Sequence, residues 1–225
     1  MPPFLPASRI KLTRRDRGRF PGTTLFDALA RAVCEAECLP RRELYESWEV
    51  ARRVRRRFRG GRVVDLACGH ALVAHVMLLL DDTSPSALAI DPRPTPSAAT
   101  VASALAMAWP RLAGRVTIEA RSIADVELGP GDVVVATHAC GHWTDEVIDR
   151  AVAVRARLAL LPCCQDEETC DAGGLTGWMD LALAVDTTRV ARLRAEGYAV
   201  ATQTIPRAIT AKNRLLLGAP RDGGG

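Results

Sequence analysis

Short hydrophobic runs alternate with helical patterns along most of the chain. Five runs rich in Val, Ala, Leu and Ile each end at a small, polar or acidic residue, as buried strands do. We predict strands at 62–67, 86–91, 115–120, 132–137 and 157–162. The 3.6-residue spacing of apolar positions predicts helices at about 71–81, 96–108, 143–155 and 187–196. This alternation indicates an α/β fold with a mainly parallel sheet.

The two ends of the chain carry different patterns. Tyr198–Ile205 and Arg214–Gly218 both read as strands with no helix between them, which predicts a closing β-hairpin. Two helical patterns, from Thr24 and from about 42 to 58, precede the first strand. We therefore expect three parts, listed in chain order: an irregular basic arm at 1–22, a helical extension at 23–60, and a cofactor-binding domain at 61–220.

Composition narrows the class of protein. The chain has 225 residues, of which 48% are hydrophobic, enough for one sizeable core. It has no apolar run of about 18 residues and no signal-peptide core near Met1, so we expect a cytoplasmic protein without a membrane span. The seven cysteines are odd in number and include the adjacent Cys163 and Cys164, so we expect reduced thiols.

Positive charge is concentrated in two segments, although the net charge is only +4. Residues 52–62 carry seven arginines, and residues 9–19 carry five arginines and one lysine. Such clusters can bind the phosphates of RNA, which makes RNA a candidate partner. A solvated helix face would look similar, so both interpretations remain open.

The turn after the first predicted strand points to a nucleotide-type cofactor. Asp65 is followed by Ala67, Cys68 and Gly69, small residues that let a ligand approach the backbone closely. Asp91 ends the second strand, where a carboxylate can accept hydrogen bonds from both ribose hydroxyls. The phosphate-cradling pattern G-x-G-x-x-G of dinucleotide sites is absent. The turn therefore favours S-adenosylmethionine, which has no phosphate, over NAD.

The segment after the third strand is a candidate adenine site. Ser122, Ile123 and Asp125 follow the strand end, where Asp125 could accept from the adenine amine and Ile123 could contact the ring. A loop carboxylate that caps a helix or is simply solvated is the alternative.

The fourth and fifth strands deliver polar residues to the same expected edge of the sheet. His138 is a candidate general base, and Cys140 is a candidate nucleophile. We place Cys163, Cys164 and Trp143 on the substrate side. The alternatives are a structural histidine, core cysteines and a core tryptophan. The candidate metal ligands are His138, Cys140, Cys163, Cys164 and Cys170, whose side chains suit zinc. The usual C-x₂₋₄-C spacing is absent, so we assign no metal site.

These pieces together resemble the class I S-adenosylmethionine-dependent methyltransferases. The chain is more narrowly similar to the methyltransferase-domain family of glutathione S-transferase C-terminal domain-containing protein and, distantly, to the tRNA position-4 2′-O-methyltransferase. The resemblance covers about residues 40–218 and rests on four segments. They are Asp65-Leu66-Ala67-Cys68-Gly69-His70, His138-Ala139-Cys140-Gly141 with Thr144-Asp145, Pro162-Cys163-Cys164, and Lys212-Asn213-Arg214-Leu215-Leu216.

The resemblance implies a Rossmann-like sheet of seven strands whose last strand is antiparallel. It also implies S-adenosylmethionine as methyl donor, with contacts from Asp65, Ala67, Gly69 and Asp91. The paired glycines of the broader superfamily are missing from the first loop. We therefore expect a methyltransferase that acts on RNA, with a protein or small-molecule acceptor, or a non-catalytic cofactor- or metal-binding module, as the alternatives.

Overall fold

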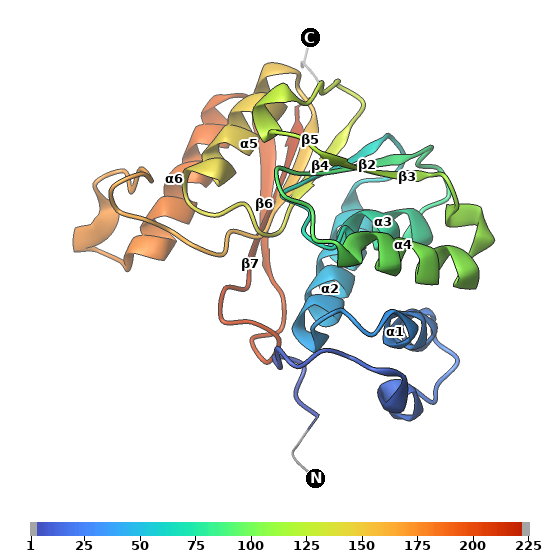
Figure 1. The fold of residues 1–225 in the computed structure, drawn as a ribbon. Coiled ribbons are helices and arrows are strands. Elements are labelled where there is room, and N and C mark those ends of the chain that lie inside the picture. The colour runs from blue at the N-terminus through green and yellow to red at the C-terminus, as the bar shows by residue number, and fades with distance from the viewer. Residues whose placement is uncertain (1–3, 222–225) are drawn as a thin grey trace.

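A twisted seven-stranded sheet lies at the centre of the computed structural model, which describes residues 4–221 (Figure 1). Its strand order is β3-β2-β1-β4-β5-β7-β6. β7 runs antiparallel to both of its neighbours, and the other pairings are parallel. The strands are β1 (Val63–Leu66), β2 (Ala87–Asp91), β3 (Val116–Ala120), β4 (Val133–Ala136), β5 (Arg157–Leu160), β6 (Tyr198–Thr204) and β7 (Arg214–Pro220).

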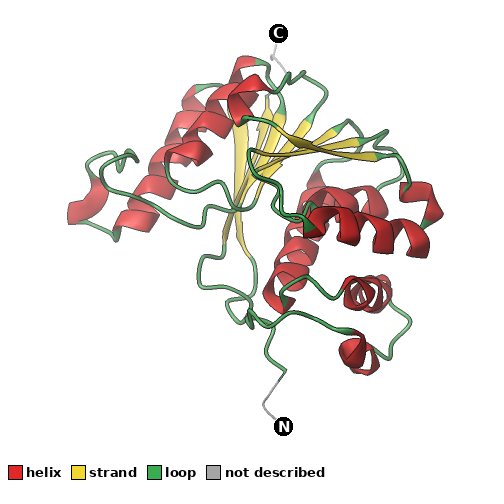
Figure 2. Cartoon of the chain, viewed as in Figure 1, coloured by secondary structure: helices red, strands yellow, loops and turns green. Residues whose placement is uncertain are grey.

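Helices cover both faces of this sheet (Figures 1 and 2). α2 and α3 pack together on one face, where α4 joins them and α1 lies farther out against α4. α5 and α6 pack on the opposite face. The helices are α1 (Leu25–Ala36), α2 (Arg41–Arg57), α3 (Leu72–Leu80), α4 (Ser97–Ala108), α5 (His142–Ala153) and α6 (Leu181–Ala195). The predicted α/β fold with its antiparallel last strand is confirmed.

The central strands form because they are apolar on both faces. All four residues of β1 and all four of β4 are buried. Strands covered by helices on both sides read as continuous runs of Val, Ala and Leu, and this is the pattern that revealed them in the sequence. Their side chains divide into two buried clusters, one on each face of the sheet. The parallel ladder brings the carboxyl ends of β1, β2 and β4 to one edge.

The amino-terminal arm is more regular than the irregular segment that we predicted. Residues 1–3 lie outside the described residues, but Arg14–Arg19 form a 3₁₀ helix. Leu12 and Phe20 are buried in the core beside α1 and α2. Burying such side chains stabilises a fold by roughly 1.5–3 kcal/mol each. Phe20 also stacks edge-on against Phe4, with ring centroids 5.8 Å apart. The high arginine content concealed these apolar anchors in the sequence.

The predicted hairpin is present, whereas the preceding helix begins earlier than its apolar spacing suggested. β6 and β7 pair from Tyr198 with Pro220 to Thr204 with Arg214. α6 begins at Leu181 rather than at 187. The Asp180 side chain caps it by accepting a hydrogen bond from the Leu183 amide at 3.0 Å. Among residues 4–221, no helix is long and apolar enough to cross a membrane.

Candidate active site

A pocket of about 280 Å³ opens at the carboxyl edge of β1, β2 and β4. Ligands bind at this edge in open α/β sheets, where loops after adjacent strands separate. Six predicted site residues line it, together with seven others. The predicted ones are Ala67, Cys68, Gly69, Asp91, His138 and Trp143. The others are Glu43, Ser47, His70, Leu72, Val73, Thr95 and Thr137.

The loop after β1 has an unusual backbone conformation. Ala67, Gly69 and Ala71 have φ values of 59°, 53° and 56°, a left-handed region that favours glycine. Two of these three positions are alanine, so the loop carries backbone strain of the kind that collects at ligand sites. A Cβ at Gly69 would meet no atom within 4 Å, so this turn faces open space. The backbone is thereby exposed to a ligand in the pocket.

Asp91 joins the loops after β1 and β2. One carboxylate oxygen accepts a hydrogen bond from the Gly69 amide at 3.1 Å, and the other accepts from the Arg93 amide at 2.9 Å. A carboxylate has about four lone-pair sites, so Asp91 keeps acceptor capacity toward the pocket. This geometry fits the predicted ribose contact, which remains a prediction.

Asp65 lies beneath the loop and does not line the pocket. It is fully buried, and its Oδ2 accepts from the Ala74 amide at 3.2 Å. Its Oδ1 has no hydrogen-bond partner among the described residues. Burial raises the pKa of Asp65 from 3.8 to about 7; the Ala74 hydrogen bond opposes this, and the charge of Asp91 adds to it. Asp65 therefore links the end of β1 to the backbone of α3 beneath the pocket.

The helical extension supplies one wall of the pocket. The sequence did not predict this contribution. Glu43 and Ser47 come from α2, and Nδ1 of His70 lies 2.6 Å from Oε2 of Glu43. This contact links α2 to the loop after β1. No local signal in the sequence pairs residues 43 and 70, because only the packing of α2 on α3 brings them together.

The wall after β4 is held by a buried arginine. His138 is half-buried and lines the pocket. The hydroxyl of buried Thr144 donates to the Ala139 carbonyl at 2.5 Å. Nη2 of Arg189, on α6, donates to the Gly141 carbonyl at 3.0 Å and lies 2.6 Å from the Asp145 carboxylate. Arg189 therefore fixes the turn that follows His138. Sequence reasoning missed this residue, because it lies 44 positions from its partner Asp145.

The candidate nucleophile Cys140 and the two predicted substrate-side cysteines, Cys163 and Cys164, lie beside one another, but they are not among the residues that line the pocket. Sγ of Cys140 is 2.8 Å from Sγ of Cys163, and Cys164 lies close to both. Burial raises the pKa of Cys140 and of Cys163, and the neighbouring thiols raise that of Cys163 further. All seven cysteines are free, as predicted.

The predicted adenine segment also lies outside the pocket lining. Ser122 caps the 3₁₀ helix Ile123–Asp125 by accepting from the Ala124 amide at 3.2 Å. Ile123 is buried in the core, and Asp125 is exposed. Their role in adenine binding stays a prediction.

The strand order, the reversed seventh strand and the pocket at the carboxyl edge define a Rossmann-like methyltransferase fold. Residues 42–170, more than half of the chain, match the methyltransferase-domain family model, and the chain belongs to this family. No curated protein matches the chain.

Solved structures of methyltransferases share the fold. An O-methyltransferase family protein from Burkholderia thailandensis is 22% identical with a TM-score of 0.54, over 93% of this chain and 64% of that one. Precorrin-6y C5,15-methyltransferase from Geobacter metallireducens is 15% identical with a TM-score of 0.50, over 79% and 88%. An S-adenosylmethionine-dependent O-methyltransferase from Thermotoga maritima is 13% identical with a TM-score of 0.50, over 80% and 66%. The chain thus spans slightly less than two thirds of the first and third proteins.

Proposed function

We propose that this chain transfers a methyl group from S-adenosylmethionine to an acceptor at the pocket. The observation that carries the proposal is the strained turn after β1 joined to the Asp91 carboxylate, at the edge where β4 presents His138. Membership of the methyltransferase-domain family supports the reaction class. The absence of a phosphate-cradling glycine pattern supports a donor without a pyrophosphate.

The residues present fit this donor. Asp91 retains acceptor sites for ribose hydroxyls, and the exposed backbone at Gly69 permits close approach. Asp65 lies beneath the loop after β1, and its hydrogen bond to the Ala74 amide supports that turn from below. S-adenosylmethionine supplies a methyl group activated by a sulfonium centre. The protein contributes by holding the acceptor in line with that methyl group and by taking up the proton that the acceptor loses.

His138 is our candidate for accepting that proton. It lines the pocket on the β4 side, and an imidazole can accept a proton at neutral pH. Cys140 is the weaker candidate for a catalytic role, because only a thiolate attacks efficiently and burial raises the pKa of this thiol. We therefore assign proton transfer to His138 and no covalent step to Cys140.

RNA is the candidate acceptor that the sequence favours. The two basic segments of the chain, 9–19 and 52–62, differ in their relation to the pocket. Within 52–62, five of the seven arginines pair with carboxylates: Arg52 and Arg53 with Glu49, Arg55 and Arg59 with Asp81, and Arg62 with Asp132. This segment ends at the start of β1, away from the pocket edge. An isolated backbone β-bridge joins Lys11 to Pro40, just before α2. The first turns of α2 reach the pocket. Within 9–19, Arg14, Arg17 and Arg19 also pair with carboxylates, so the position near the pocket, and not charge pairing, separates the two segments. On that ground we infer that any RNA contact involves residues 9–19.

The test is transfer of labelled methyl from S-adenosylmethionine into a cell extract separated into RNA, protein and small-molecule fractions. Label in one fraction would identify the acceptor class. Label in RNA would also support the narrower similarity to the tRNA enzyme. Label in none, with donor binding retained, would favour a non-catalytic cofactor-binding module.

The matched binding experiment uses Asp91→Ala. We expect about a 10- to 100-fold weaker Kd for S-adenosylmethionine in a calorimetric titration, because hydrogen bonds to charged groups contribute about 1.5–3 kcal/mol. Circular dichroism of the variant should match the parent protein. Unchanged affinity would remove the ribose assignment.

A further inference from the structure

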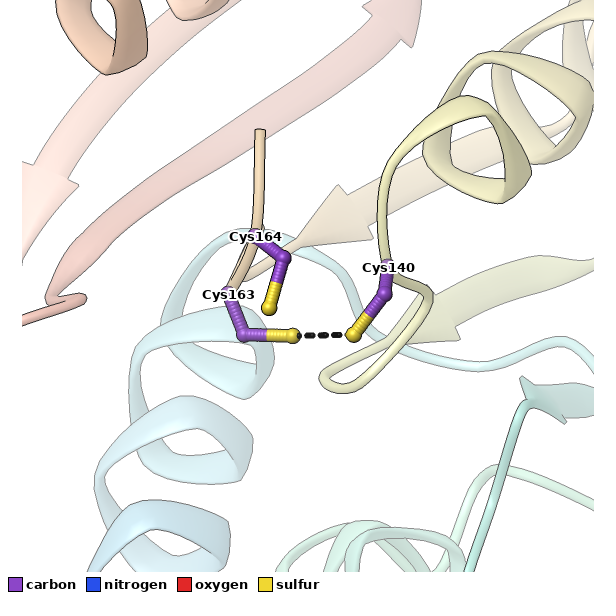
Figure 3. Close-up of side chains that lie close together, drawn as sticks. All are labelled: Cys140, Cys163 and Cys164. Carbon is purple, nitrogen blue, oxygen red and sulfur yellow. Dashed lines mark hydrogen bonds between the residues drawn. The ribbon is translucent and has the colours of Figure 1, made fainter. Parts of the chain in front are cut away.

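Three thiols from two loops meet at one point beside the pocket wall (Figure 3). Cys140 follows β4, and Cys163 and Cys164 follow β5. Their sulfur atoms all lie within 4.8 Å of one another, and the Cys140 and Cys163 sulfurs are 2.8 Å apart. Because 23 positions separate Cys140 from Cys163, the convergence comes from the fold.

The backbone holds these loops together without help from the thiols. β4 and β5 are adjacent parallel strands, with Ala136 opposite Leu160 at their ends. Beyond the ladder, the Gly141 amide donates to the Cys164 carbonyl at 3.1 Å. Arg189 fixes Gly141 from α6. The two loops are therefore held side by side before any ligand binds, which lowers the cost of binding a ligand between them.

Neutral thiols gain little from such a convergence, because S–H is a weak hydrogen-bond donor and sulfur a weak acceptor. Ionised thiols would repel one another. Accordingly, burial and the neighbouring thiols raise the pKa of Cys163. A cation among the three sulfurs would reverse this effect, because a coordinating thiol loses its proton outright.

We propose that Cys140, Cys163 and Cys164 form a three-thiolate site for a soft ion of the zinc type. Zinc–sulfur bonds of about 2.3 Å place tetrahedral ligands about 3.8 Å apart. The three sulfurs already lie within 4.8 Å of one another, and those of Cys140 and Cys163, now 2.8 Å apart, would separate by about 1 Å to bind the ion. Binding of Zn²⁺ releases the three thiol protons and leaves a complex of net charge −1. The fourth position is left to a ligand from solution, because Cys140 and Cys164 are exposed.

This site is independent of the proposed methyl transfer. It binds the loops after β4 and β5 to one ion and so steadies the turn next to His138. A disulfide between Cys140 and Cys163 is the competing arrangement. It would require an oxidant and would leave Cys164 without a role, whereas one ion uses all three sulfurs.

The experiment titrates the reduced, metal-stripped full chain with Co²⁺ and then with Zn²⁺. We expect one equivalent of Co²⁺ to produce a sulfur-to-cobalt charge-transfer band, which Zn²⁺ then removes. Cys140→Ser and Cys163→Ser should each weaken Zn²⁺ binding by more than the about 10- to 100-fold typical of outer-shell partners. Cys38→Ser is the matched control, because this half-buried thiol contacts the Ser97 carbonyl instead, and its binding should equal the parent's.

Absence of the charge-transfer band in the reduced protein would overturn the proposal. So would an equal loss of binding in Cys38→Ser, which would indicate general thiol binding. A Cys140–Cys163 disulfide found by mass spectrometry, in a chain that binds no Co²⁺ when reduced, would establish a redox pair instead. If Cys163→Ser fails to fold by circular dichroism, the exposed Cys164→Ser carries the test in its place.

Discussion

Two sides of the pocket are built in different ways. On the side that we propose binds the methyl donor, which the loops after β1 and β2 form, backbone amides and a carboxylate fix the geometry: the Gly69 and Arg93 amides both donate to Asp91. On the proposed acceptor side, which the loop after β4 forms, a side chain from a distant element fixes the turn: Arg189 reaches Gly141 from α6. The three thiols of the loops after β4 and β5 converge beside this turn, outside the pocket lining.

The two sides therefore acquire their geometry from different parts of the chain. The donor side depends on a short turn and the next strand end, so its geometry follows from local sequence. The acceptor side depends on Arg189, whose side chain is 2% exposed and whose carboxylate partners, Asp145 and Asp186, come from two helices. A donor site can thus be recognised in a sequence more readily than an acceptor site.

The sharpest test of this division is His138→Ala on the acceptor side. A general base typically contributes about 100- to 10,000-fold to the rate, so kcat should fall by that factor while the Kd for S-adenosylmethionine stays unchanged. Turnover assays and calorimetry measure the two quantities. The control is His142→Ala, an exposed neighbour outside the pocket lining. Normal turnover in His138→Ala would end the assignment.

The next largest effect should follow Arg189→Met. Removing one partner of a buried ion pair destabilises a protein by about 3–5 kcal/mol, because charges stay buried without compensation. Urea unfolding measures the loss. Arg192→Met, three residues further along α6, removes an exposed pair with Asp149 and should cost no more than about 1 kcal/mol. Equal losses in the two variants would refute the special role of Arg189.

On the donor side, Asp65 should make stability depend on pH. Its pKa is raised from 3.8 to about 7 by burial, so the folded state binds a proton that the unfolded state releases between these values. The stabilisation is complete below about pH 4 and is lost as pH rises through about 7. The loss is on the order of a few kcal/mol, since one pKa unit corresponds to about 1.4 kcal/mol.

Asp65→Asn cannot ionise and should lack this contribution. Urea unfolding at pH 5 and pH 8 should therefore show the parent protein losing stability relative to the variant as pH rises. Parallel pH profiles for the two proteins would contradict the assignment.

The smallest expected effect is that of Asp125→Ala. If Asp125 accepts from the adenine amine, the Kd for S-adenosylmethionine should rise by a factor of a few, since one hydrogen bond contributes about 0.5–1.5 kcal/mol. The structure places this exposed carboxylate outside the pocket lining, so affinity equal to the parent's would end the adenine prediction.

Sequence patterns predicted most of the fold because its central strands are unbroken apolar runs. β1 and β4 each lie within one residue of their predicted bounds at both ends, and small or polar residues mark where they end. The structure of the amino-terminal arm was harder to predict, because Leu12 and Phe20 are isolated among arginines. Periodicity cannot reveal anchors that belong to no regular element.

The residues of the pocket also divide into those that the sequence could predict and those that it could not. Ala67, Gly69 and Asp91 could be predicted, since each sits at a strand end whose position the pattern defines. Glu43 could not, because its place in the pocket depends on how α2 packs against α3. The sequence brought the three thiols to one expected edge but assigned them no metal, because they come from neighbouring strands rather than from one short motif.

The contact between Glu43 and His70 joins α2, which supplies one wall of the pocket, to the loop after β1. A molecule held in the pocket favours the conformation in which α2 is docked, so part of its binding free energy opposes local opening of that helix. Amide hydrogen exchange in α2 therefore becomes a gauge of pocket occupancy. It would rank candidate ligands by their protection of this helix, even before any methyl acceptor is known.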